Sequence, residues 1–203
     1  DLATLRPREG RNAVSLVATQ LYRALTSPGT TRALAAFDAV LVGGAALAPG
    51  LRARAEAVGI RVIETYGMSE TCGGCVYDGT PLAGVAVRLD AGRVHLAGAM
   101  LASGYLDLPP DAAGQPFVIR DGVRWLVMPD VAHYEAGRLV IDGRADDVLI
   151  SGGSNVAPLV VERALSGLGG EWLVVGVPDG RWGQLVTAVT TSDADLAAVR
   201  AAT

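Results

Sequence analysis

The segment Glu64–Thr71 combines residue types that can bind a nucleotide phosphate and its metal ion. It reads Glu-Thr-Tyr-Gly-Met-Ser-Glu-Thr and directly follows a predicted strand, Arg61–Glu64. Ligands of parallel α/β sheets bind at the carboxyl ends of strands. An aromatic ring there could stack on a base, a glycine would permit close backbone approach, and Ser69 and Glu70 could hold a phosphate and Mg²⁺. On spacing alone, a glycine turn with a surface carboxylate explains the same residues.

The two cysteines, Cys72 and Cys75, follow this segment with the spacing Cys-x-x-Cys. That spacing suits a redox dithiol or half of a zinc site. The sequence has no second cysteine pair, and His95 and His133 are not spaced like metal ligands. We therefore favour two small packed residues in a glycine-rich turn.

The elements before this segment predict a parallel α/β unit. Apolar residues from Val14 to Leu25 fall at helical spacing, and Ser-Pro-Gly at 27–29 ends that helix. A short buried strand at Ala39–Val42 is followed by a helix from Pro49 to Val58 and by the strand Arg61–Glu64. A strand, helix and strand of these lengths are typical of a parallel sheet.

From Thr80 onward the pattern changes to short alternating runs, which predict antiparallel strands and hairpins. These runs are Val85–Leu89, Arg93–Leu96, Val123–Val127 and Arg138–Ile141. A charged segment, Asp142–Asp147, then marks a domain boundary near Gly143. The elements predicted beyond it are a strand at Val148–Ile150, a glycine loop, a helix at Pro158–Leu168, strands at Trp172–Val177 and Gln184–Thr190, and a helix beginning near Asp193.

The overall composition excludes several classes of protein. A net charge of −4 and a pI near 5.1 argue against a nucleic-acid partner. No run approaches the roughly 18 apolar residues of a membrane span, and the start does not read as a secretory signal, so we predict a cytoplasmic protein. The sequence is compatible with a homo-oligomer. All 17 basic residues are arginine, which removes lysine from the possible catalytic groups.

Five further segments follow Tyr66–Thr71 in a recognisable order. They are Gly92–Gly98, Ser103–Leu106, Trp125 with Asp130, Gly143–Asp147, and Ser151–Pro158 with Val161-Glu162. Together these segments resemble, over roughly residues 14–190, the adenylate-forming superfamily of acyl-CoA synthetases, peptide-synthetase adenylation domains and luciferases. Tyr66–Gly79 is particularly similar to the o-succinylbenzoate–CoA ligases of menaquinone biosynthesis.

The resemblance implies a mixed α/β fold in two parts. Residues 1–142 would be the C-terminal part of the large adenylate-binding domain, and residues 143–203 the first part of the small mobile domain. Two family features are missing: the phosphate loop, for which Thr26–Thr31 is too short, and the catalytic lysine. The family's Thr-Gly-Asp is here Met128-Pro129-Asp130. We therefore expect that the chain lacks both ends of the enzyme and is inactive alone.

The resemblance also implies a reaction in two half-reactions. A carboxylic acid and Mg²⁺-bound ATP would give an acyl-adenylate and pyrophosphate, after which CoA would displace AMP. Tyr66 would stack on adenine, Ser69 would contact the α-phosphate, and Glu70 would help to hold Mg²⁺. Gly67 and Met68 lie between them in the same nucleotide-binding segment.

Other residues would complete the site. Gly43, Gly44 and Ala45 would line the adenine and acyl pocket, and Asp130 would accept both ribose hydroxyls. In the second part, Arg144 would contact the ribose or phosphate and Asp146 would be the hinge. The pantetheine path of CoA would be flanked by Gly152 and Gly153.

Plainer interpretations stand beside each role. Asp130 after Pro129 could cap a turn, Arg144 and Asp146 could be a solvated pair, and the glycines could serve only tight turns. Two alternatives to the function remain as well. One is a related ligase for an aryl or fatty acid, or with a carrier-protein acceptor. The other is a degenerate, non-catalytic nucleotide-binding or interaction module.

Overall fold

The computed structural model describes residues 2–106, 108–109 and 114–203. Residues 1, 107 and 110–113, which belong to the predicted first domain, lie outside this described part. The chain divides into two compact units. The first comprises the chain up to Arg88 with His95–Val127 and Ala136–Leu139, and the second comprises Leu89–Val94, Met128–Glu135 and Val140–Thr203.

The first unit contains the predicted parallel sheet. Its strand order is β1-β2-β3-β4-β5, with β1, β2 and β3 parallel and β4 and β5 added antiparallel. The strands are β1 (Ala13–Val17), β2 (Ala39–Gly43), β3 (Val62–Met68), β4 (Gly73–Tyr77) and β5 (Thr80–Pro81). The predicted parallel α/β unit is confirmed.

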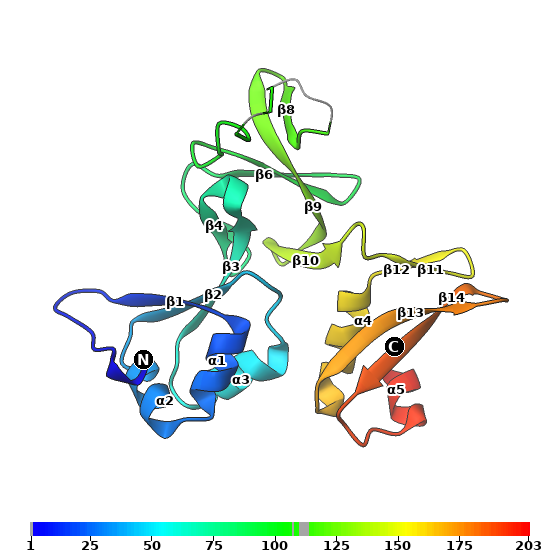
Figure 1. Ribbon diagram of the computed structural model, residues 1–203, viewed down its shortest axis with the longest axis horizontal. Coiled ribbons are helices and arrows are strands. Elements are labelled where there is room, and N and C mark those ends of the chain that lie inside the picture. The colour runs from blue at the N-terminus through cyan, green and yellow to red at the C-terminus, as the bar shows by residue number, and fades with distance from the viewer. Residues whose placement is uncertain (1, 107, 110–113) are drawn as a thin grey trace. The chain divides into compact units, whose positions relative to one another are not determined.

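Three helices gather beside the parallel strands and build the core with them (Figure 1). They are α1 (Ala18–Leu25), α2 (Pro28–Ala35) and α3 (Pro49–Ala57), and short 3₁₀ turns lie at η1 (Leu2–Thr4) and η2 (Ser69–Thr71). Leu21 and Leu34 from the helices are fully buried with Val40 and Val42 of β2. Burial of side chains of this size stabilises a fold by about 1.5 to 3 kcal/mol each.

The predicted helix at Val14–Leu25 is wrong in its first part. Residues 13–17 form β1, where Val14 pairs with Val40 and Leu16 with Val42. Helix α1 begins at Ala18, directly after β1. The apolar residues of the strand and of the helix therefore have, together, the spacing expected of a single helix. The end of this helix at Leu25 is confirmed, but Pro28 also opens a second helix, α2, which was not predicted; at its first turn the missing N–H of proline costs nothing.

A second sheet has the order β10-β9-β7-β6, and β8 pairs antiparallel with β9. Its strands are β6 (Ala86–Asp90), β7 (Arg93–Ala97), β8 (Phe117–Arg120), β9 (Val123–Glu135) and β10 (Arg138–Arg144). Two-residue turns join several consecutive strands, at Ala91-Gly92, Asp121-Gly122 and Ala136-Gly137. Both residues of each turn have positive φ, as the tight turns that match strand twist require.

Two strands of this sheet are longer than predicted. Strand β9 runs past Val127 to Glu135, so Asp130 lies within a strand. Strand β10 runs past Ile141 to Arg144, so the first half of the predicted charged segment is strand. Pro129 and Gly143, which favour turns, hid these extensions from the sequence pattern.

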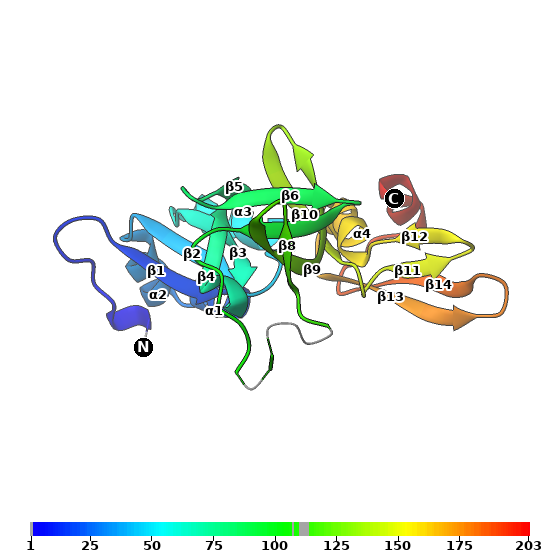
Figure 2. The same ribbon diagram turned by 90° about the horizontal axis from the view of Figure 1, so that it is seen from above.

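The second unit contains a sheet of order β12-β11-β14-β13, which carries α4 and α5 on one face (Figure 2). Its elements are β11 (Leu149–Ser151), β12 (Ser154–Val156), α4 (Pro158–Leu165), η3 (Ser166–Leu168), β13 (Trp172–Asp179), β14 (Gly183–Thr190) and α5 (Leu196–Ala202). The predicted elements of this region are present, and β12 was missed. None of the helices in the described residues is long and apolar enough to cross a membrane.

Candidate nucleotide-binding site

Gly43, Gly44 and Ala45 lie where β2 ends. A Cβ at Gly43 would collide with the hydroxyl of Thr65 on β3 and lie 2.9 Å from its carbonyl oxygen. The Thr65 hydroxyl donates to the Val42 carbonyl at 3.3 Å, which holds the two strands together at this point. Gly44 has a φ of +82°, which favours glycine, and Ala45 is exposed. The glycines thus allow the chain to leave the sheet beside β3.

Tyr66, Gly67 and Met68 form the last residues of β3 rather than a loop after it. The register with β4 shifts between Tyr66 and Gly67, and a Cβ at Gly67 would collide with the Gly73 carbonyl. The predicted position of this segment, after a strand ending at Glu64, is therefore wrong. The strand continues because β4 folds back and pairs with it, which the local sequence does not reveal.

The turn that follows is fixed by Thr71, which is buried. Its hydroxyl accepts the Met68 N–H at 2.9 Å and lies 2.7 Å from the Gly73 carbonyl oxygen, to which it can donate. Ser69 and Glu70 occupy the same short turn, with Ser69 exposed and Glu70 half-buried. The hydroxyl and the carboxylate are therefore presented together directly after the strand.

Glu70 is contacted by a segment 35 residues further along. The Tyr105 hydroxyl donates to its carboxylate at 2.6 Å, and the Ala102 N–H donates to its carbonyl at 2.8 Å. Among the described residues no group of three or more His, Cys, Asp or Glu side chains could hold a metal ion. A single carboxylate still fits Mg²⁺ that arrives on ATP, because Mg²⁺ usually takes one or two carboxylates with phosphate oxygens and waters.

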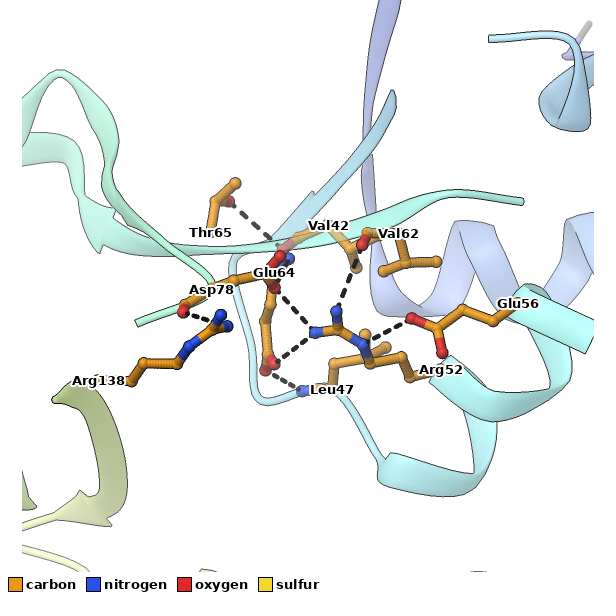
Figure 3. Close-up of polar contacts among 9 residues, drawn as sticks. All are labelled: Val42, Leu47, Arg52, Glu56, Val62, Glu64, Thr65, Asp78 and Arg138. Carbon is orange, nitrogen blue, oxygen red and sulfur yellow. Dashed lines mark hydrogen bonds and ion pairs between the residues drawn. The ribbon is translucent and has the colours of Figure 1, made fainter. Parts of the chain in front are cut away.

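Arg52 of α3 ties the surroundings of the glycines to β3 (Figure 3). Its guanidinium donates to Glu56 at 2.9 Å and to Asp78 at 2.8 Å, and it lies 3.8 Å from Glu64. Glu64 accepts the Leu47 N–H at 3.4 Å, so the chain after Ala45 is bonded to the residue that precedes Thr65 and Tyr66. We call Arg52, Glu56, Glu64 and Asp78 the Arg52 cluster.

Asp78 lies in the turn between β4 and β5 and completes the Arg52 cluster. Its carboxylate accepts the Glu64 N–H at 3.0 Å as well as the Arg52 donor. Burial alone raises the pKa of Asp78, but the bonds from Arg52 and Glu64 outweigh it, and the pKa lies below its usual value of 3.8. Hydrogen bonding to Asp78 in turn raises the pKa of Arg52. Arg52 and Asp78 therefore both carry their charges near neutral pH.

In the second unit, Asp130 and Arg144 are brought near one another. The Ala145 N–H donates to the Pro129 carbonyl at 2.8 Å, which joins the middle of β9 to the turn after β10. Asp130 is half-buried in the strand, so the interpretation that it caps a turn is wrong. Hydrogen bonding to Asp146 chiefly raises the pKa of Arg144, and the charge of Asp130 contributes.

Arg144 and Asp146 form an exposed two-pronged pair. The guanidinium donates to both carboxylate oxygens, at 2.9 and 2.8 Å. The same bonds lower the pKa of Asp146. The solvated pair considered from the sequence is thus present in this conformation, and it leaves both groups accessible to a ligand.

Gly152 and Gly153 form the tight turn between β11 and β12. Their φ angles are +58° and +84°, and the Gly152 N–H donates to the Trp182 carbonyl at 2.9 Å. A Cβ at Gly152 would lie within 3 Å of the Trp182 ring. The turn geometry alone accounts for glycine at these positions, and a role beside pantetheine stays a prediction.

The sequence of the chain is similar to the sequences of known CoA ligases. The chain is 44% identical over 193 residues to the probable 2-succinylbenzoate–CoA ligase of Mycobacterium tuberculosis, covering 92% of this chain and 49% of that protein. It is 32% identical to the 2-succinylbenzoate–CoA ligase of Enterococcus faecalis, covering 93% and 43%. The chain is homologous to part of the adenylate-forming ligases. It spans about half the length of the curated relatives it matches.

Solved structures of adenylate-forming enzymes agree with this relationship. E. coli MenE with a bound phenylether-linked analogue of OSB-AMS matches with a TM-score of 0.69 at 30% identity, covering 92% of this chain and 43% of that one. Apo MatB from Rhodopseudomonas palustris matches with a TM-score of 0.77 at 26% identity, covering 94% and 44%. No family model matches the chain. The predicted resemblance and the mixed α/β fold of a partial domain are confirmed.

Three polar residues of this chain were missed in the sequence analysis. Tyr105 lay in a recognised segment without a role, and Arg52 and Asp78 were not considered. The Arg52–Glu56 spacing of four residues and the turn signal Asp78-Gly79 were visible. The contact between Arg52 and Asp78 could not be predicted from these signals, because the two residues are 26 positions apart in the sequence.

The cysteines of the chain are both free and differ in environment. Cys75 is buried in β4, and burial raises the pKa of its thiol, whereas Cys72 is exposed. The prediction of two packed residues in a turn is therefore correct for neither. Cys72 is not packed, and Cys75 lies in a strand.

Proposed function

We propose that this chain is part of an ATP-dependent acid–CoA ligase that works through an acyl-adenylate, with 2-succinylbenzoate as the acid. The observation that carries the proposal is the 44% identity, over 92% of this chain, to a probable 2-succinylbenzoate–CoA ligase. The arrangement of Tyr66, Glu70 and Thr71 at the end of β3 supports it, since a strand end in a parallel sheet is where such ligands bind.

In the first half-reaction, a carboxylate oxygen of the acid attacks the α-phosphorus of ATP. The bond from that phosphorus to the bridging oxygen breaks, and pyrophosphate leaves. Tyr66 stacks on adenine beside Gly43, Gly44 and Ala45, Ser69 donates to the α-phosphate, and Asp130 accepts the ribose hydroxyls. Glu70 would hold Mg²⁺ together with the phosphates, and the ion would supply positive charge that offsets the negative charge of the phosphate oxygens.

In the second half-reaction, the CoA sulfur attacks the acyl carbon after losing its proton. The bond between the acyl carbon and the phosphate oxygen breaks, and AMP leaves with the bonding electrons. Arg144 contacts the ribose or phosphate, and the chain turns at Asp146 between the two steps. Gly152 and Gly153 flank the pantetheine path. The acyl phosphate is a better electrophile than the carboxylate, so one difficult step becomes two easier ones.

The acyl pocket follows Glu70 in this proposal. Cys72, Gly73 and Gly74 are small and leave room for an aromatic ring. The chain has no lysine, so the carboxylate that does not react needs an arginine, backbone amides or a residue from the rest of the enzyme. We place the reaction in the cytoplasm, where ATP and CoA are available.

A panel of carboxylic acids tests the proposal. Protein expressed from the complete gene is given ATP, Mg²⁺ and CoA with 2-succinylbenzoate, benzoate or fatty acids, and pyrophosphate release is followed. We expect kcat/KM to favour 2-succinylbenzoate by roughly 100-fold, which corresponds to about 2.7 kcal/mol of selective transition-state binding. A fatty acid is a meaningful competitor, because the long-chain-fatty-acid–CoA ligase FadD13 of M. tuberculosis is 31% identical to this chain. If a fatty acid or benzoate wins, the substrate assignment fails.

A further inference from the structure

The segment Ala102–Tyr105 holds Glu70 at two points, its side-chain carboxylate and its backbone carbonyl. The Tyr105 hydroxyl donates to one carboxylate oxygen at 2.6 Å. The backbone N–H of Ala102 donates to the Glu70 carbonyl at 2.8 Å. One contact orients the carboxylate, and the other holds the backbone from which the side chain extends.

Arg124 of β9 holds the segment Ala102–Tyr105 in turn. Its guanidinium donates to the Ala102 carbonyl at 2.8 Å and to the Ser103 carbonyl at 3.0 Å. The same guanidinium stacks 4.0 Å from the centre of the Phe117 ring, which lies 6.1 Å from the Tyr105 ring. A planar guanidinium that binds two carbonyls and an aromatic face is a rigid support. Tyr105 is therefore held in place although 39% of its surface is exposed.

The hydrogen bond from Tyr105 leaves the second carboxylate oxygen of Glu70 available to a cation. The Tyr105 hydroxyl occupies one carboxylate oxygen of Glu70 as a hydrogen-bond donor. A carboxylate with one oxygen occupied by a hydroxyl offers the other oxygen to a cation. Mg²⁺ needs near-ideal octahedral geometry, so a carboxylate fixed in direction suits it better than a rotating one.

We propose that Tyr105 is a positioning residue that presents Glu70 to the Mg²⁺ of bound ATP as a ligand with one free oxygen. Arg124 and Phe117 keep Tyr105 in the required place. This inference rests on the proposed function, since that function brings Mg²⁺ and ATP to Glu70. It adds that the affinity of the site for the metal is set by a hydroxyl 35 residues away in sequence.

The variant Tyr105→Phe removes the hydroxyl and keeps the ring. In protein from the complete gene, pyrophosphate release is measured at fixed ATP while Mg²⁺ is varied. We expect the Mg²⁺ concentration at half-maximal rate to rise by about 5-fold or more, the effect of losing a hydrogen bond to a charged group. The rate at saturating Mg²⁺ should return to within about twofold of the parent value, because the carboxylate itself remains. The matched control Tyr134→Phe, on an exposed tyrosine of β9, should leave the Mg²⁺ dependence unchanged.

A second variant separates positioning from a purely structural role. In a Glu70→Gln background, Tyr105→Phe should shift the Mg²⁺ dependence no further, because the two side chains act as one unit. An unchanged Mg²⁺ dependence in Tyr105→Phe would overturn the proposal. So would a lower melting temperature and lower rate at every Mg²⁺ concentration, which is the pattern of a structural contact.

The inference and the proposed function can fail separately. If the parent protein releases no pyrophosphate with any acid, the proposed function fails. The Mg²⁺ dependence of ATP binding is then measured by titration calorimetry on the same variants. A shift in Tyr105→Phe, absent in Tyr134→Phe, would support the positioning role, and equal curves would overturn it.

Discussion

Two arginine–aspartate pairs in this protein have the same bond length and very different surroundings. Arg52 and Asp78 in the first unit approach to 2.8 Å, and so do Arg144 and Asp146 in the second. The side chains of the first pair are 32% and 26% exposed, and those of the second 50% and 62%. The first pair joins residues far apart in sequence, whereas the second joins residues two positions apart.

The difference teaches which pair constrains the fold. Arg52 also contacts Glu56 and Glu64, so its removal would take the cationic partner from three carboxylates at once. Arg144 donates to Asp146, which is exposed, so water can replace these hydrogen bonds at little cost in free energy. We infer that the Arg52 cluster holds the candidate site in shape, and that Arg144 and Asp146 can exchange partners when a nucleotide binds.

The largest expected effect concerns nucleotide binding by the second unit, which contains the exposed pair Arg144 and Asp146. Replacing Asp130 with alanine should weaken ATP binding by about 1 to 3 kcal/mol, the cost of losing hydrogen bonds to a charged group. Titration calorimetry on protein from the complete gene measures the dissociation constant for ATP. Asp147→Ala, which removes an exposed carboxylate from the nearby turn, serves as the control. A dissociation constant unchanged by Asp130→Ala would remove Asp130 from the site.

The next effect concerns the stability that the Arg52 cluster gives to the first unit. Arg52→Met should lower the free energy of unfolding by about 1 to 2 kcal/mol. The substitution leaves the partly buried carboxylates of the Arg52 cluster without their cationic partner, and water screens their negative charge only in part. Urea unfolding measures this loss. Arg61→Met, at an exposed arginine just before β3, should change stability by no more than about 0.5 kcal/mol. Equal losses in the two variants would show that the cluster does not constrain the fold.

A smaller effect is the pH dependence of the same cluster. Because the pKa of Asp78 is lowered in the folded state, its charge stabilises the protein above the unfolded pKa of about 3.9. This contribution is lost as the pH falls through the lower folded pKa. The stability difference between the parent and Asp78→Asn should therefore be constant from pH 7 to about 5 and shrink below about 4. A difference that stays constant down to pH 3 would contradict the assignment.

The smallest effect on stability belongs to the exposed pair. Arg144→Gln and Asp146→Asn should leave the melting temperature unchanged, because water replaces the lost bonds. Arg144→Gln should nevertheless slow thioester formation if Arg144 contacts the nucleotide. A fall in melting temperature as large as that of Arg52→Met would erase the contrast between the two pairs.

The sequence identified the family and a set of candidate site residues, because the residues that carry the resemblance stand in short, ordered segments. Glu70 and Ser69 share one turn after β3, and Asp130 and Arg144 lie near each other, as the interpretation required. Their roles in binding remain predictions. Strands with a clear local alternation, such as Arg93–Leu96, were predicted well.

The errors arose where long-range pairing decides the structure. Residues 13–17 and 65–68 are strands because β2 and β4 lie beside them, and no local period distinguishes these cases. The Arg52–Asp78 and Tyr105–Glu70 contacts join residues 26 and 35 positions apart. Spacing rules that work within one helix or one turn could not bring such residues together.

The central claim is that this chain belongs to an enzyme that forms an acyl-adenylate. Acid-dependent exchange of labelled pyrophosphate into ATP tests it most directly, since the exchange requires the first half-reaction alone and no CoA. With protein from the complete gene, we predict exchange that depends on both 2-succinylbenzoate and Mg²⁺ and that is lost in Glu70→Gln at low Mg²⁺. Absence of exchange with every carboxylic acid, in protein that is folded and binds ATP, would contradict the claim.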